Sequence, residues 1–150
     1  MRTFIDERGQ TWDLRLDVSA LERCAAVGIH LDEVLSGKSD LLIRLRFDAP
    51  LIARTLAAIC RPAFPLHQVK TDEEFIALLT PAVLGRAKAL LRDELVGFFT
   101  QFDPGAGRPL QLWLEKDKDL ARMLAPLAVS AAAPLLSSGA GSGGAPGSAA

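Results

Sequence analysis

Apolar and polar residues alternate without a break from Thr11 to Val18. A period of two puts every second side chain on the same face, so this pattern predicts a strand with one buried and one solvated face. The predicted buried face carries Trp12, Leu14, Leu16 and Val18.

A second short strand is predicted over Arg2–Asp6, just before the first. Glu7–Gly9 joins the two, and its glycine suits the left-handed position of a three-residue hairpin turn. This turn places Phe4 opposite Trp12 on the buried face, as a cross-strand aromatic pair. Because an isolated hairpin is not stable in water, we expect it to pack on helices.

Helix-start patterns occupy much of the remaining chain. Ser19 and Thr71 each precede a glutamate by three positions, which predicts a capping box with the Ser or Thr as N-cap. Asp48 is followed closely by Pro50, another helix start. Few polar residues follow Pro50, so this helix is expected at the centre of the core. The expected helical segments are approximately 19–27, 31–35, 48–60, 71–79, 80–99 and 110–124.

The last two helical segments are each expected to bury one apolar face, and a loop rich in Gly and Pro over 102–109 separates them. The predicted inward residues are Leu84, Ala87, Leu91, Leu95 and Phe98 in the first, and Trp113, Leu114, Leu120 and Leu124 in the second.

Residues 41–47 fit two structures. Ile43, Leu45 and Phe47 alternate with arginines, as in a strand, whereas Leu41, Leu42 and Leu45 also share one face of a helix. Short apolar runs do not decide between these alternatives, and we favour the helix.

Together these elements predict an α+β fold that is mostly helical, with the hairpin packed on a bundle of about five to six helices. The 150 residues suit one domain, which we expect over 1–125. Residues 126–150 are apolar at first and then rich in Gly, Ser, Ala and Pro, which predicts a flexible tail.

The formal net charge of −1 argues against a dedicated nucleic-acid binder, which usually has a strong basic excess. The first residues become charged before any apolar run develops, unlike a signal peptide. The sequence contains no uncharged apolar stretch of about 18 residues, so we expect no membrane span. We therefore expect a cytoplasmic protein.

Two residue patterns resemble nucleotide-binding motifs, and each fails a physical requirement. Gly37-Lys38-Ser39 lacks the earlier glycine of a phosphate-binding loop and has Asp32 in its place. Gly139, Gly141 and Gly144 have dinucleotide-binding spacing, but no helix follows to hold a pyrophosphate.

Metal binding and catalysis are not expected either. Cys24, His30, Cys60 and His67 are not spaced as zinc ligands, and we expect two buried thiols and two ordinary histidines. No nucleophile has a recognisable base and orienting group, so we expect no catalytic residues and no cofactor. A small enzyme or nucleotide binder remains the least favoured alternative.

Two segments are candidates for contact with a protein partner. Residues 38–70 carry six Lys or Arg against two Asp, which indicates either a face for an acidic partner or charges compensated within the fold. The apolar segment 124–136 is either a packed helix end or a docking segment. The predicted contact residues are Arg44, Arg46, Arg54, Leu124, Leu127, Leu135 and Leu136.

The segments Arg2–Asp6, Gly9–Trp12, Ile59–Pro62 and Glu94–Phe99 resemble small phage and prophage proteins, most closely the tail assembly chaperones of long-tailed phages. The resemblance covers about residues 2–100 and implies a helical protein that coats the tape-measure protein before the tail tube polymerises. It also implies that the protein acts in the cytoplasm of a bacterial host cell, and it transfers no catalytic residue. The apolar grooves that such a chaperone offers to a partner helix also favour self-association to a homo-oligomer. The alternatives are a minor structural or adaptor protein of a phage-like particle, or a small binding module with another partner.

Overall fold

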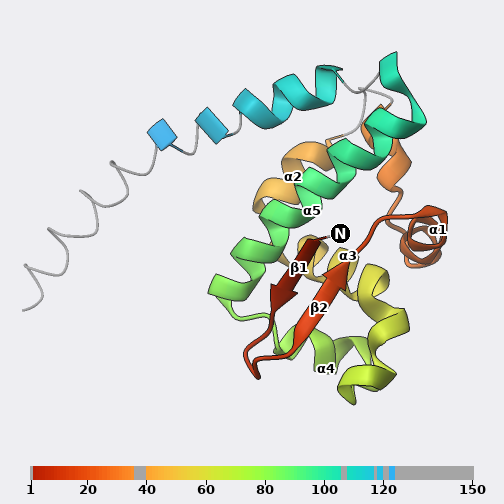
Figure 1. Cartoon of the computed structure of the whole chain (residues 1–150), viewed down its shortest axis with the longest axis vertical. Coiled ribbons are helices and arrows are strands. Elements are labelled where there is room, and N and C mark those ends of the chain that lie inside the picture. Colours follow the sequence, from red (N-terminus) through yellow and green to blue (C-terminus); the bar gives the residue numbers. More distant parts are fainter. Residues whose placement is uncertain (1, 36–39, 106–107, 117, 120–121, 124–150) are drawn as a thin grey trace, which may run out of the picture. The chain divides into compact units, whose positions relative to one another are not determined.

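The computed structural model describes residues 2–35, 40–105, 108–116, 118–119 and 122–123 (Figure 1). The chain divides into two units, Met1–Gln111 and Leu112–Ala150. The described residues of the second unit are helical, and Trp113 and Leu114 are half-buried. The predicted domain boundary at 125/126 falls within this second unit, and the predicted flexible tail lies outside the described residues.

The first unit has the predicted α+β architecture. Strands β1 (Arg2–Ile5) and β2 (Thr11–Leu14) form an antiparallel hairpin in which Phe4 lies opposite Trp12, as predicted. Gly9 has a φ of 82°, the left-handed conformation that the three-residue turn requires. Both members of the aromatic pair are buried, so the hairpin turns its apolar face inward.

The end of β2 and the start of the first helix differ from the prediction. The strand ends at Leu14, and Val18 is exposed as the first residue of helix α1 (Val18–Ala26). The Asp17 carboxylate, rather than the Ser19 hydroxyl, caps this helix by accepting a hydrogen bond from the amide of Ala20 at 2.8 Å. An acidic cap accepts a hydrogen bond from a free amide, and its negative charge also interacts favourably with the positive end of the helix dipole.

The helix was the correct choice for residues 41–47, which form α2 (Leu41–Phe47). Leu41 and Leu45 are buried on one side, whereas Ile43 is exposed. Asp48 then caps α3 (Ala49–Cys60) by accepting from the amide of Leu51 at 3.0 Å, as the pattern predicts.

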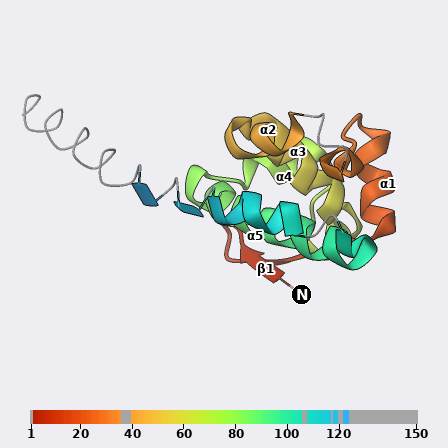
Figure 2. The same ribbon diagram turned by 90° about the horizontal axis from the view of Figure 1, so that it is seen from above.

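Helix α3 occupies the centre of the first unit, as predicted. It packs against α1, α2, α4, α5 and β2, and it is buried along almost its whole length. Figure 2 shows α2 and the hairpin on opposite sides of α3. The guanidinium of Arg23 from α1 donates to the carbonyls of Ala58 and Ile59 at 2.8 and 3.0 Å. A cation thereby satisfies two of the open carbonyls at the negative end of α3.

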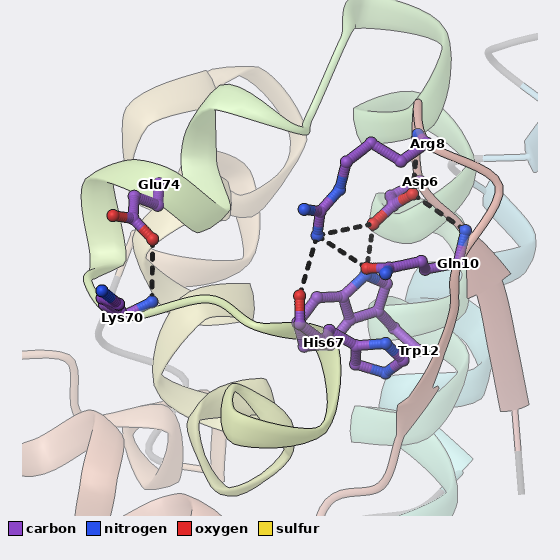
Figure 3. Close-up of polar contacts among 7 residues, drawn as sticks. All are labelled: Asp6, Arg8, Gln10, Trp12, His67, Lys70 and Glu74. Atoms are coloured by element: carbon purple, nitrogen blue, oxygen red, sulfur yellow. Dashed lines mark hydrogen bonds and ion pairs between the residues drawn. The ribbon is translucent and has the colours of Figure 1, made fainter.

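Three 3₁₀ helices, η1 (Leu31–Leu35), η2 (Arg61–Ala63) and η3 (Pro65–His67), accompany the α-helices in the described part of this unit. Helix α4 (Asp72–Ala77) ends two residues before the predicted limit. Its N-cap Thr71 accepts from the amide of Glu74 at 3.1 Å. Glu74 reaches back to the amide of Lys70 at 2.8 Å, one residue earlier than a standard capping box (Figure 3).

Helix α5 (Pro81–Phe102) buries a slightly different face from the predicted one. Leu84 and Phe98 are only half-buried, whereas Val83 and Phe99 are buried. Val83 and Phe99 continue the four-residue spacing of Ala87, Leu91 and Leu95, a row of side chains on one face. The predicted loop at 102–109 is also wrong in part, because residues 102, 104–105 and 108–109 are helical.

An aromatic cluster fixes the hairpin on the helices. The Trp12 ring meets Phe75 of α4 edge-to-face at 4.9 Å and Phe64 edge-to-face at 6.0 Å between ring centroids. Phe64 and Phe75 stack at 5.3 Å. Such pairs stabilise a core beyond the area that they bury.

Candidate partner-binding groove

Two adjoining hollows lie where the end of α2 and the starts of α3 and α5 meet α4 and the segment after it. Their volumes are about 400 and 200 Å³, and Ala49 and Leu84 line both. We call the pair the apolar groove. It is lined by Arg46, Phe47, Ala49, Pro50, Ile52, Ala53, Arg54, Ile76, Leu79, Pro81, Leu84, Gly85 and Lys88.

The apolar groove exposes large hydrophobic side chains because three helix boundaries meet there. Phe47 is the last residue of α2, and 72% of it is exposed where the chain turns at Asp48 into α3. Leu79 lies between the end of α4 and the start of α5, and Leu84 is in the first turns of α5. Leu79 and Leu84 are half-buried, so part of each side chain remains accessible to solvent.

The charged side chains that line the apolar groove are all basic. The Arg46 guanidinium lies 5.0 Å from the centre of the Phe47 ring, and the Lys88 ammonium donates to the Arg46 carbonyl at 3.2 Å. Arg54 is exposed on α3. The lining residues include no carboxylate. This combination of apolar surface and positive charge is suited to contact with another polypeptide.

The predicted contact residues are brought together only in part. Arg46 and Arg54 line the same groove, whereas Arg44 does not line it and pairs with Asp48 at 3.4 Å. Leu124, Leu127, Leu135 and Leu136 lie outside the described residues.

The sequence interpretation missed Phe47, Leu79 and Leu84 as surface residues. The sequence predicts Leu84 among the buried residues of α5 and places Leu79 in the helix before it. The Pro81 start of α5 marks the helix boundary, but no sequence signal shows which leucine near it remains accessible.

A polar cluster ties the hairpin turn to η3 (Figure 3). The Asp6 carboxylate accepts from the amides of Arg8 and Gln10 at 2.8 and 3.0 Å and from the Trp12 indole at 2.9 Å. Arg8 in turn donates to the His67 carbonyl at 3.1 Å. The His67 ring lies 4.1 Å from that of Trp12. These contacts make the cluster a structural link between the hairpin and the helices.

Asp6 is 5% exposed, and its environment has opposing effects on its pKa. Burial alone would raise the pKa, but the hydrogen bonds from Trp12, Gln10 and Arg8 and the positive charge of Arg8 lower the pKa below its ordinary value. The ionised form is therefore the one that the fold stabilises.

Asp6→Asn should lower the free energy of unfolding by about 1–3 kcal/mol at pH 7. The amide has only one oxygen, so its NH2 group would face at least one of the N–H donors that the carboxylate now accepts from. The difference from wild type should shrink as the pH falls below about 4, because the unfolded chain then binds a proton at Asp6 that the folded chain, with its lowered pKa, binds less readily. Urea unfolding at pH 7 and at about pH 2.5 measures both values. A difference that grows on acidification would contradict the conclusion that the fold stabilises the ionised form of Asp6.

A separate hollow with charged walls, of about 610 Å³, lies beside the hairpin and α5. Arg2 and Glu94 form an ion pair there, and Glu94 also accepts from the amide of Leu16 at 3.4 Å. These contacts fasten both ends of the hairpin to α5. Glu94, which begins one of the segments of the phage-protein resemblance, therefore has a packing role.

The residues considered for metal binding or catalysis do not form a cluster. Cys24 and Cys60 are buried free thiols on α1 and α3, His30 is exposed, and the His67 ring contacts Trp12 in a tilted arrangement. No group of three or more His, Cys, Asp or Glu side chains suited to a metal ion occurs among the described residues. The Gly37–Ser39 and Gly139–Gly144 motifs lie outside those residues.

Within the part of the chain that the structure describes, no helix combines the length and apolar character needed to cross a membrane. Comparison of the chain with protein-family models, with curated proteins and with solved structures gave no significant match.

Proposed function

We propose that this chain is a non-enzymatic protein-binding module that holds a helical segment of its partner in the apolar groove. The observation that carries the proposal is the exposure of Phe47 beside the half-buried Leu79 and Leu84. Contiguous exposed apolar surface with a polar rim is typical of interaction sites. The groove also satisfies the main requirement of helix-in-groove recognition, since it offers an apolar floor between helices.

The partner that we propose is a tape-measure protein, which this chain would coat as a tail assembly chaperone. The support is the resemblance of Arg2–Asp6, Gly9–Trp12, Ile59–Pro62 and Glu94–Phe99 to phage tail assembly chaperones. A chaperone for a long helical client needs reversible apolar contacts rather than a reactive centre. The apolar groove provides contacts of that kind.

Phe47→Ala tests the proposal in a co-expression experiment with a tape-measure gene product. The wild-type chain should elute with that product from a sizing column. The variant should bind about 30-fold more weakly or worse, as expected when a central aromatic anchor is truncated. Phe102→Ala is the matched control, because 72% of Phe102 is also exposed and it does not line the groove.

Clean separation of the wild-type chain from the tape-measure product would contradict the proposed partner. Equal binding by both alanine variants would contradict the groove as the binding site. Detection of the chain in purified particles would favour the alternative of a minor structural or adaptor protein, since a chaperone should be absent from the finished particle.

A further inference from the structure

We infer that the apolar groove selects an acidic amphipathic helix, with carboxylates flanking its apolar face, over a neutral or basic one. This inference rests on the proposed function and specifies the chemistry of the partner. It is carried by the charges of the lining residues: Arg46, Arg54 and Lys88 are basic, and none of the other lining residues carries a charge.

Arg54 provides the clearest evidence for charge left available to a partner. It is exposed on α3 and lines the same hollow as Ile76, Leu79 and Leu84. It forms no hydrogen bond or ion pair with any residue that the structure describes. A carboxylate of a bound helix would therefore meet an uncompensated guanidinium directly beside the apolar surface.

Lys88 and Arg46 add positive charge on the other side of Leu84. The Lys88 ammonium donates to a backbone carbonyl, which does not neutralise it. The Arg46 guanidinium lies over the Phe47 ring, so this cation and the most exposed aromatic side chain of the groove form one surface. Complementary charge at such a rim raises the association rate and rejects partners of like charge.

The apolar floor favours a polypeptide over a nucleic acid as the acidic partner. A phosphate backbone would leave Phe47, Leu79 and Leu84 uncovered, whereas an amphipathic helix would bury them. The formal net charge of −1 also gives the whole chain little long-range attraction for a polyanion.

Two labelled peptides provide the direct test with the full chain. Both are designed amphipathic helices of about 20 residues with the same leucine face, and they carry either Glu or Lys at the flanking positions. In fluorescence anisotropy at low salt, the Glu peptide should bind at least about tenfold more tightly than the Lys peptide. Its affinity should fall when salt is raised, because Arg54 is exposed and Arg46 and Lys88 are only half-buried, so salt screens their charges. A single-stranded oligonucleotide should not displace it.

Arg54→Glu and Arg86→Glu then separate local charge from net charge. Both substitutions change the charge of the chain equally, but Arg86 lies on α5 against β1 and outside the groove. Arg54→Glu should weaken binding of the Glu peptide about tenfold or more, and Arg86→Glu should change it less than about twofold. Circular dichroism verifies that both variants are folded.

Equal affinity for the two peptides, no measurable binding of either, displacement by the oligonucleotide, or equal effects of the two charge reversals would each overturn the inference. These failures are distinguishable from failure of the proposed function. If Phe47→Ala weakens binding of the tape-measure product while the two peptides bind equally, the groove binds its partner without selecting for charge. If Phe47→Ala leaves that binding unchanged, the proposed function itself is wrong.

Discussion

Trp12→Ala should lower the free energy of unfolding by about 3–5 kcal/mol, a large part of the total stability of a small domain. The Trp12 side chain is 0% exposed and packs against Phe64 and Phe75. Its removal opens a cavity between the hairpin and α4. It also deprives the buried Asp6 carboxylate of its hydrogen bond from the indole.

Urea unfolding followed by far-UV circular dichroism measures this loss. Trp12→Phe separates the two contributions, because it keeps an aromatic ring and removes only the indole N–H and part of the volume. We expect it to lie between wild type and Trp12→Ala. Ile5→Ala is a control on the same hairpin and should change stability by less than about 0.5 kcal/mol, because 53% of Ile5 is exposed. A wild-type unfolding midpoint for Trp12→Ala would contradict the packing of the hairpin on the helices.

The two cysteine thiols should be almost unreactive in the folded protein and become reactive when it unfolds. Burial, opposed by nearby arginines, raises the pKa of Cys24 to about 11. Burial also raises the pKa of Cys60 to about 12, with Arg23 opposing the shift. At pH 8 these values reduce the reactive thiolate to about 10⁻³ and 10⁻⁴ of each thiol, against about 10⁻¹ for an exposed cysteine. Burial also denies access to the reagent, so the combined protection should be larger still.

Labelling with a disulfide reagent at pH 8 measures the effect. The folded chain should react with far less than one equivalent of the reagent in the time that both cysteines react in the chain unfolded by guanidinium. Cys24→Ala and Cys60→Ala assign the signals to each site. Raising the pH from 8 to 9.5 should increase the thiolate fraction at both sites without bringing either thiol near full ionisation. Rapid labelling of the folded wild-type chain would show that one of these cysteines lies on an accessible surface.

Local sequence patterns predicted the hairpin and most helix starts. The turn needs only Gly9 and the correct loop length, and the caps at Asp48 and Thr71 need only an acceptor side chain before an open helix end. These interactions span a few residues, so the sequence contains all that they require. Asp17 shows the limit of such reasoning, since two neighbouring side chains, Asp17 and Ser19, could each cap α1 and the backbone geometry selected the first.

The candidate site was predictable only in part, for the same physical reason. The basic character of residues 38–70 indicated Arg46 and Arg54, but whether a particular arginine faces a groove or pairs with a carboxylate depends on the fold. Arg44 pairs with Asp48, one turn later on the chain. The apolar lining of the groove comes from residues of α2, α3, α5 and the α4 region, and their meeting point is set by packing between these helices.

The sequence by itself determined an α+β chain with an N-terminal hairpin, a central apolar helix and capped helix starts, because each of these follows from periodicity or from contacts between near neighbours. Only the tertiary structure decided which face of α5 is buried, that Arg23 of α1 binds the open carbonyls of α3, and that Phe47 and Leu84 line an exposed groove. Those outcomes depend on contacts between residues far apart in the chain, and hydrophobicity alone does not distinguish a leucine in the core from a leucine at a binding surface.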